Sequence, residues 1–289
     1  SVPVAFAIRG NVGNHWETYK KSWDIDFVDL GGRQIKLIKP SDRGYLNQMF
    51  VQHIADWLGV PTPDIDVVRL VVNQHDFGIY LQYEDFDRAF IELSGYGSDT
   101  QPAKNSFRDH FDAYAVTEEL SRIAIAGGTG DRSDQQAVVT TEFTSENITQ
   151  FFERDIFARW LALQMFLGDR HQSEEDNFRF FLDRSTGRYV MVNWDSSVSA
   201  VNPEEVMTGA GLIATFYANA DNADLTDQYV RELVAAAPQF REHYRQLVSD
   251  NLPILTNDAA LEVSPAILEA SLAGLLAQFD ANVAALEGF

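Results

Sequence analysis

The first 85 residues are dominated by short runs in which apolar and polar positions alternate, the period of half-buried β-strands. The Gly31-Gly32 pair and the QHD segment at 74–76 separate such runs and are typical of hairpin turns. Residues 41–58 instead place apolar side chains three and four positions apart, which predicts a helix. The strand-like runs are VAFAIRG (4–10), KKSWDIDFVDL (20–30), RQIKLIK (33–39), VVRLVVN (67–73) and FGIYLQYEDF (77–86).

Beyond residue 85 the pattern becomes mainly helical. Residues 87–106 lose periodicity and contain Gly, Ser and Pro, which predicts a linker or a flexible surface segment. Apolar side chains at helical spacing then predict helices over residues 111–126, 146–168, 227–249 and 264–289. We therefore expect an α+β fold with a β-rich lobe of about five strands and one helix at residues 1–85 and a mainly helical lobe at residues 86–289, together forming one domain.

One stretch of the helical part, residues 168–197, changes character and is rich in polar groups. Asp169 follows the end of a helical run, Asn177 comes before a predicted β-hairpin, and Asp195 comes after it. A base, an amide oxygen and a second carboxylate can together grip a metal-bound triphosphate and orient a hydroxyl nucleophile. Taken alone, an Asp directly after a helix is more often a turn or capping residue. The predicted hairpin strands are FRFFL (178–182) and RYVMVNW (188–194).

Composition and charge exclude some classes of protein and argue against others. The chain has 289 residues, a 45% hydrophobic content and no cysteine, so it can bury a large core but cannot form disulfides or zinc-thiolate sites. Its formal net charge of -21 argues against a general nucleic-acid binder. Residues 1–43 differ, with seven basic and five acidic side chains. This region is suited to a small polyanion such as a nucleotide, or it is an ordinary strand surface with lysines.

The sequence shows no sign of membrane insertion. It contains no apolar run long enough to span a bilayer. Its beginning, SVPVAFAIRG, lacks the basic start and the apolar segment of a signal peptide, and earlier removal of such a peptide stays open.

Several residues of the first lobe are candidates for nucleotide contacts. Gly10 and Asn11 open a loop rich in glycine and asparagine, whose backbone amides suit phosphate, although a plain hairpin loop explains them as well. Glu84 is a candidate for the adenine side of a nucleotide or for the start of a turn. The lysines that can neutralise phosphate oxygens are Lys36, which we favour, Lys39 and Lys21.

The order of these segments resembles the two-lobed protein-kinase fold, and more specifically the CotH kinase family of spore-coat-protein-H-like atypical kinases. The resemblance extends from about residue 4 to about residue 200 and depends on the order of the segments more than on any one of them. The matching segments are IRGN (8–11), KKSWDIDF (20–27), LGVPTP (58–63), VVRLVVNQHDFGIYLQYEDFD (67–87), Asp169, Asn177 and NWD (193–195).

The resemblance implies ATP-dependent phosphorylation of serine, less often threonine, in a protein substrate with serine-rich segments. It implies Asp169 as the catalytic-loop carboxylate, and Asn177 and Asp195 as ligands of Mg²⁺, with Mn²⁺ or Ca²⁺ as alternatives. It also implies a secreted or extracytoplasmic location. Acceptor protein, oligomeric state and the choice between phosphoryl and nucleotidyl transfer are left open by the sequence.

Three departures from the family pattern keep other functions open. Asp169 and Asn177 lie eight positions apart, against about five in an ordinary kinase catalytic loop. Ser196 and Ser197 stand where a second acid is common, and the first helix offers Asn47 and Gln48 where an acidic partner for the strand lysine is expected. The alternatives are a pseudokinase that binds nucleotide or protein as a scaffold, and an accessory domain that binds carbohydrate or calcium.

Overall fold

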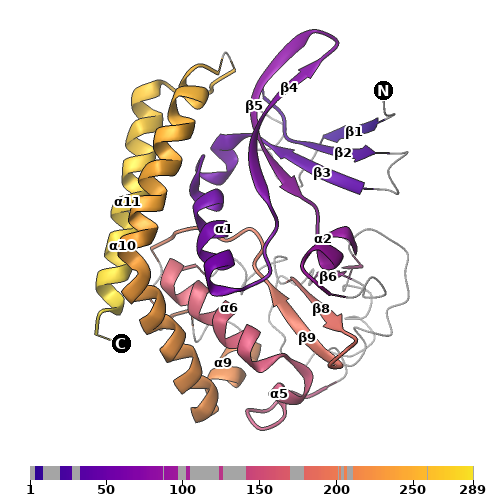
Figure 1. Cartoon of the computed structure of the whole chain (residues 1–289), viewed down its shortest axis with the longest axis vertical. Helices are drawn as coiled ribbons and strands as arrows, with labels where there is room; N and C mark the ends of the chain where they lie inside the picture. The colour runs from indigo at the N-terminus through magenta and orange to yellow at the C-terminus, as the bar shows by residue number, and fades with distance from the viewer. Residues whose placement is uncertain are drawn as a thin grey trace. The chain divides into compact units, whose positions relative to one another are not determined.

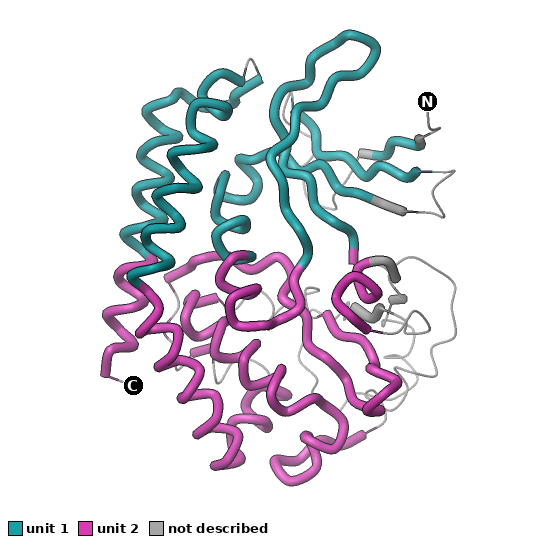
Figure 2. Tube along the Cα trace, in the orientation of Figure 1, with its two compact units in different colours: residues 1–52, 63–85, 238–278 teal, residues 53–62, 86–237, 279–289 magenta. Residues whose placement is uncertain are grey.

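The computed structural model describes residues 4–8, 20–27, 33–86, 88–96, 102–104, 124–125, 141–169, 179–200, 202, 205–206, 211–258 and 260–288. The chain divides into two compact units (Figure 2). Unit 1 comprises Ser1–Gln52, Pro63–Asp85 and Pro238–Gln278, and unit 2 comprises His53–Thr62, Phe86–Ala237 and Phe279–Phe289.

Unit 1 is built on a five-stranded antiparallel sheet with the order β1-β2-β3-β5-β4 (Figure 1). A short 3-10 helix, η2 (Pro40–Arg43), follows β3 and leads to the helix α1 (Asn47–Leu58). The five strands and one helix expected from the first 85 residues are therefore confirmed. The strands are β1 (Val4–Ile8), β2 (Trp23–Phe27), β3 (Arg33–Ile38), β4 (Ile65–Val72) and β5 (His75–Glu84).

Alternation along the strands gives this sheet two apolar faces. On one face Ile38, Leu81 and Tyr83 pack with Met49 of α1. On the other face Ile25, Leu37 and Tyr80 form a separate cluster. A third cluster joins Tyr45, Leu46 and Ile79 to Leu255, Leu268 and Leu272, which come from the C-terminal helices α10 (Ala220–Thr256) and α11 (Pro265–Leu286). Residues 238–278 thus complete the core of unit 1.

Unit 2 surrounds a helix that is buried along most of its length, α6 (Arg154–Leu167). A four-stranded antiparallel sheet with the order β7-β6-β8-β9 contacts α6 through β9. The strands are β6 (Pro102–Lys104), β7 (Ala124–Ile125), β8 (Arg179–Asp183) and β9 (Arg188–Val192); the short helices are α2 (Arg88–Leu93), α5 (Ile148–Phe151) and α9 (Gly211–Tyr217).

The α+β class is confirmed, with an antiparallel sheet in the N-terminal region and a helical C-terminal part. The hairpin predicted after Asn177 is confirmed as β8 and β9, and the last helix as α11. The helix predicted over residues 227–249 is longer and continues through Pro238 and Pro253. The division into lobes at residues 1–85 and 86–289 stays a prediction. One boundary between the compact units does fall after residue 85, but unit 1 also contains residues 238–278 and unit 2 also contains residues 53–62.

Three local predictions need correction. Residues 87–106 are not a plain linker, because they contain α2 and β6. Ala124 and Ile125 pair with β6 as a strand rather than ending a helix, and the rest of residues 111–126 lies outside the described residues. The helix predicted over residues 146–168 is broken at Glu153, whose N–H bonds the carbonyl of Tyr189 on β9 at 2.8 Å. Pairing with a strand thus overrides local helical periodicity.

Across the part of the chain that the structure describes, no helix combines the length and the apolar character needed to cross a membrane.

Candidate active site

The helix that precedes Asp169 ends in a glycine-capped turn. Gly168 has a φ of 62° and donates its N–H to the carbonyl of Met165 at 3.2 Å. Asp169 donates its N–H to the carbonyl of Gln164 at 2.9 Å. These two bonds form a Schellman motif, in which glycine suits the left-handed position because it has no Cβ. The motif fixes the backbone of Asp169 against the end of α6.

The Asp169 side chain is buried beside the segment that leaves β9. It is 2% exposed, and its Oδ2 accepts a hydrogen bond from the backbone N–H of Ser197 at 2.8 Å. A carboxylate at this end of a helix faces the negative end of the helix dipole, so it needs hydrogen-bond donors to be held there. Ser197 supplies one. The bond joins Asp169 to a residue only two positions beyond Asp195.

Asp195 lies in the strand-exit segment, which we define as residues 193–197. Its φ is 60°, in the left-handed region that residues with a Cβ adopt rarely, although Asp tolerates it better than most. Its side chain is partly exposed, whereas Asn193 and Ser196 on either side of it are buried. The segment therefore presents Asp195 as its accessible carboxylate.

Asn193 ties the strand-exit segment to the LGVPTP turn that follows α1. Its backbone N–H bonds the carbonyl of Pro61 at 2.8 Å, and its Nδ2 donates to Thr62 Oγ1 at 3.0 Å. The same turn is held to α6 by Arg159, whose Nη1 donates to the carbonyl of Leu58 at 2.7 Å. Two separate parts of unit 2 thus fix the backbone on the N-terminal side of Asp195.

Trp194 anchors the same segment in an apolar cluster. Its ring lies 6.1 Å from that of Phe86, and the guanidinium of Arg179 lies 5.5 Å above it. Phe181 and Val192 belong to the same buried cluster. Because Trp194 is only 6% exposed, it supports the position of Asp195 from the core.

The hairpin brings the start of β8 and the end of β9 to one edge, since Arg179 pairs with Val192. Asn177, expected to be a metal ligand at this edge, lies outside the described residues. Within the described ranges no group of three or more His, Cys, Asp or Glu side chains could hold a metal ion. Mg²⁺ at a nucleotide is usually bound by one or two carboxylates together with phosphate oxygens, and Asp195 and Asp169 supply carboxylates of that number and type.

In unit 1, Lys36 lies on the face of the sheet that packs against α1. It sits opposite Tyr83 in the register, and the Tyr83 hydroxyl donates to Gln48 of α1. Lys36 forms an ion pair with Asp85, and both side chains are about one-seventh exposed, at 15% and 14%. An acidic partner is therefore present for the strand lysine, and it comes from the end of β5 instead of from α1.

Lys39, by contrast, is held in a charge cluster formed by Lys20, Lys39, Asp42, Asp258 and Glu262. Its ammonium lies 3.2 Å from Asp42 and 3.5 Å from Glu262, and its side chain is 3% exposed. These contacts turn Lys39 toward the α10–α11 connection. They make Lys36 the better candidate for phosphate.

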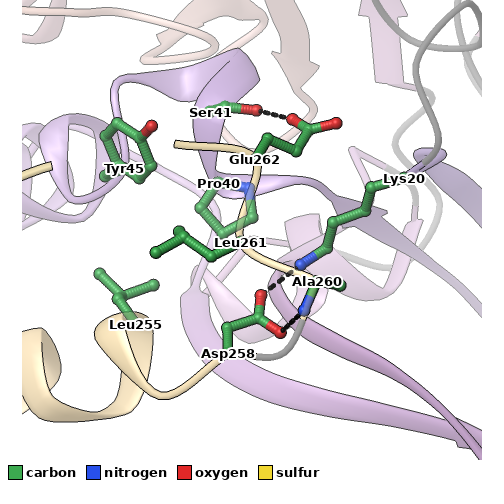
Figure 3. A pocket seen from close by; sticks show the side chains of 9 residues that line it. All are labelled: Lys20, Pro40, Ser41, Tyr45, Leu255, Asp258, Ala260, Leu261 and Glu262. Carbon is green, nitrogen blue, oxygen red and sulfur yellow. Dashed lines mark hydrogen bonds and ion pairs between the residues drawn. The ribbon is translucent and has the colours of Figure 1, made fainter. Parts of the chain in front are cut away.

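Three residues of the charge cluster, Lys20, Asp258 and Glu262, line a small recess in unit 1 (Figure 3). Lys20 donates to Asp258 Oδ2 at 2.6 Å, and Asp258 Oδ1 accepts the backbone N–H of Ala260 at 3.0 Å. Burial lowers the pKa of Lys20 below its ordinary value, and its hydrogen bond to Asp258 opposes that shift. The recess, about 10 Å³ in volume, offers room for no more than a water molecule. The cluster is thus a structural contact between the sheet and the α10–α11 connection.

Of the remaining candidates for nucleotide contacts, the structure describes Lys21 and Glu84. Lys21 is half-buried and lies two positions before the start of β2. Glu84 is the last residue of β5, pairs with Ile35 and therefore lies on the face opposite Lys36. Gly10 and Asn11 lie outside the described residues.

Sequence reasoning missed three residues that position candidate site residues within their own units. Asp85 pairs with Lys36, and the backbone N–H of Ser197 bonds Asp169. Asn282 of α11 donates to the carbonyls of Leu167 and Ser199 at 2.8 and 2.9 Å. No local sequence pattern indicates that the backbone N–H of Ser197 or the side-chain amide of Asn282 forms these bonds. Asp85 could have been predicted, because it is an acid directly after β5, the strand that pairs with β3.

Comparison with known proteins gives a family match. The model of the family described as CotH kinase protein matches residues 6–267. No curated protein matches the chain in a sequence comparison.

Two solved structures are similar to the chain at low identity. One is a chain of the Shewanella oneidensis MR-1 toxin–antitoxin complex of HipA, HipB and operator DNA, with 14% identity, a TM-score of 0.46, and coverage of 89% of this chain and 59% of that chain. The present chain therefore spans less than two thirds of it. The other is the Helicobacter pylori proinflammatory kinase CtkA, with 12% identity, a TM-score of 0.37, and coverage of 91% and 94%.

Proposed function

Because this chain belongs to the CotH kinase family, we propose that it is an ATP-dependent protein kinase that phosphorylates serine, and less often threonine, in a protein substrate. The observation that carries the proposal is the hydrogen bond of 2.8 Å from the Ser197 N–H to Asp169 Oδ2. It joins the end of α6 to the strand-exit segment and so holds Asp169 beside the residues around Asp195. Phosphoryl transfer depends mainly on such alignment of groups and on neutralisation of charge.

Asp169 is the proposed base for the acceptor hydroxyl. As the seryl oxygen forms its bond to the γ-phosphorus, the bond from that phosphorus to the oxygen of the leaving ADP breaks, and the seryl proton passes to the Asp169 carboxylate. The bond from Ser197 orients Oδ2, and the Schellman turn fixes the backbone below it. The carboxylate therefore needs little rearrangement to receive the proton.

Asp195 is the proposed metal ligand, together with Asn177. A bound divalent cation, Mg²⁺ in our proposal, neutralises charge on the phosphate oxygens and aligns the γ-phosphoryl group. Asp195 offers a hard carboxylate oxygen on a segment held by Asn193 and by Trp194. Such support keeps a metal ligand in one geometry.

Lys36 is the proposed phosphate contact in unit 1, and Asp85 is its orienting partner. An ammonium is a point charge on a flexible stem, so an ion pair that restricts its position improves alignment with phosphate oxygens. The Lys36–Asp85 pair has this arrangement within unit 1. Lys39 forms ion pairs with Asp42 and Glu262, so we assign it a structural role.

The substrate we propose is a protein with serine-rich segments, as the sequence resemblance implies. The transferred group separates this activity from nucleotidyl transfer. Incubation with γ-labelled or α-labelled ATP, Mg²⁺ or Mn²⁺ and a serine-rich protein is expected to give label from the γ position alone, on seryl oxygen in mass spectra. Label from the α position would instead identify a nucleotidyl transferase and overturn the kinase proposal.

One observation favours the second candidate, a pseudokinase scaffold. Ser196, one of the two serines that stand where a second acid is common, is 1% exposed and donates its hydroxyl to Asn193 Oδ1 at 2.6 Å. Its side chain thus supports the segment and is not presented as a ligand. If ATP binds but no label is transferred with any metal or acceptor, the scaffold replaces the kinase. If ATP does not bind, the kinase proposal fails and only a scaffold that binds protein remains.

A further inference from the structure

We propose that Ser196 and Asn193 are positioning residues that set the metal affinity of Asp195, an inference that rests on the proposed function. Both residues belong to the strand-exit segment, one directly after Asp195 and one two positions before it. Neither is a ligand in this proposal. Together they hold the left-handed backbone from which the Asp195 carboxylate projects.

The first observation is a short side-chain bond that spans Asp195. Ser196 Oγ lies 2.6 Å from Asn193 Oδ1 and 3.3 Å from Gln164 Oε1. A hydroxyl has one proton to donate, and the shorter contact is the stronger acceptor position. The Ser196 hydroxyl therefore closes a four-residue turn, 193–196, with Asp195 as its third residue.

The second observation is the backbone of Asp195 itself. A φ of 60° is unfavourable for a residue with a Cβ and needs support from its surroundings. Asn193 is fixed by Pro61 and Thr62, so the bond from Ser196 transmits that anchorage across Asp195. On the far side, Ser197 bonds Asp169. The turn is thus fixed at both ends.

The third observation is burial. Ser196 is 1% and Asn193 is 3% exposed, so water does not readily replace the bond between them when it is lost. Removing the hydroxyl deletes the hydrogen bond to Asn193 Oδ1 in a buried place. We expect the turn to relax, which moves the Asp195 carboxylate and changes the geometry it offers to a cation.

The test compares Ser196→Ala with a matched loss of a buried hydroxyl elsewhere in unit 2. Thr226 on α10 is fully buried, and its Oγ1 donates to the carbonyl of Asn222 at 2.8 Å, within its own helix. Thr226→Val removes that hydroxyl with little change of shape. Both variants should lose a comparable amount of stability, but only Ser196→Ala alters the turn at Asp195.

Mn²⁺ binding to each protein is measured by electron paramagnetic resonance with a saturating non-hydrolysable ATP analogue. Outer-sphere partners commonly change metal affinity by about 10- to 100-fold. We expect about tenfold weaker Mn²⁺ binding in Ser196→Ala and a change of less than about twofold in Thr226→Val. Equal affinity in wild type and Ser196→Ala would overturn the positioning role and leave the kinase proposal standing. Absence of binding by the wild type would overturn both.

A second readout does not need ligand. If Ser196 holds the turn, amide hydrogen exchange at Ser197 is faster in Ser196→Ala than in wild type and is unchanged in Thr226→Val. Unchanged exchange in both variants contradicts the proposal. Should Ser196→Ala lose cooperative unfolding, Ser196→Cys retains a weak donor of similar size, and the proposal then requires Mn²⁺ affinity between that of wild type and about tenfold weaker.

Discussion

At the scale of single residues, Asp195 combines an unfavourable backbone conformation with a partly exposed carboxylate. Its left-handed φ of 60° makes it one of four non-glycine residues with positive φ in the part of the chain described. Such strain persists where the surroundings enforce it, and it is frequent at functional sites. Here the enforcing contacts are those of Asn193 and Ser196.

We predict that Asp195→Gly is more stable than Asp195→Ala by about 1 kcal/mol, because glycine adopts the left-handed conformation without a Cβ penalty. Urea unfolding of both variants measures the difference. Neither should retain phosphoryl transfer, since both lack the carboxylate. Equal stability of the two would mean that the backbone at this position is not strained.

Arg69 on β4 and Asp76 on β5 form an ion pair at the surface. The Arg69 guanidinium hydrogen-bonds Asp76 and lowers the pKa of that carboxyl from 3.8 to about 2, with help from the Gly78 N–H. Because the folded-state pKa is depressed, the pair's contribution to stability is complete above pH 3.8 and is lost as the pH falls through about 2.

Carbon NMR titration of the Asp76 carboxyl measures that shift directly. We expect a midpoint near 2 in the wild type and a return toward 3.8 in Arg69→Gln. A wild-type midpoint already near the ordinary value would show that the exposed pair is screened by solvent.

At the scale of elements, α6 and its two neighbours define where the site lies. The helix ends in the Schellman turn, the β8–β9 hairpin returns beside it, and Asn282 of α11 spans both. The amide of Asn282 bonds the last residue of α6 and Ser199 beyond the hairpin. A residue far along the chain thus helps to set the distance between Asp169 and the strand-exit segment.

Asn282→Leu should cost about 1–3 kcal/mol of unfolding free energy, because it removes two hydrogen bonds in a buried place. Chemical denaturation measures the cost, with the exposed helix variant Gln246→Leu as a control. Activity should fall more than stability alone explains if the spacing of α6 and the strand-exit segment matters. Loss of stability with full specific activity of the folded fraction would argue against that coupling.

The sequence predicted elements well where one period dominates. Strand β2 alternates cleanly and was anticipated, as were β3, β5, α11 and the β8–β9 hairpin. Prediction failed at Glu153, where the helix breaks because its N–H pairs with β9. It also failed at β6 and β7, which are two or three residues long and carry no measurable period. These features depend on distant partners.

For the candidate site, chain order predicts Asp169 and Asp195, because acids after a helix and after a strand leave a visible pattern. The contacts that position them could not be anticipated. Ser197 acts through its backbone N–H, and Asp85 pairs with Lys36 only because β3 and β5 are neighbours in the sheet. Such contacts follow from topology, which a local pattern does not contain.

At the scale of the whole molecule, unit 1 is assembled from segments that are far apart in sequence. Its sheet comes from the first 85 residues, but residues 238–278 supply Leu255, Leu268 and Leu272 to its core. They also supply Tyr244, whose ring lies 4.9 Å from that of Phe50, and Asp258, the partner of buried Lys20. The β-rich segment therefore depends on the C-terminal helices.

A fragment of residues 1–85 should not fold cooperatively. It would expose the apolar face around Ile79 and leave Lys20 without its carboxylate, and removing one partner of a buried pair costs about 3–5 kcal/mol. Joining residues 238–278 through a flexible linker should restore a cooperative unfolding transition in circular dichroism. A cooperative transition of the short fragment by itself would contradict the discontinuous unit.

Under the proposed function, Asp169 and Asp195 perform phosphoryl transfer as a pair held by the strand-exit segment. The most direct measurement is the rate of γ-label transfer from ATP to a serine-rich protein by wild type, Asp169→Asn and Asp195→Asn, across a series of Mg²⁺ and Mn²⁺ concentrations. We expect measurable transfer by the wild type, a loss of at least about 100-fold in Asp169→Asn, and in Asp195→Asn a loss that added metal partly restores. Equal rates in all three proteins would contradict the account.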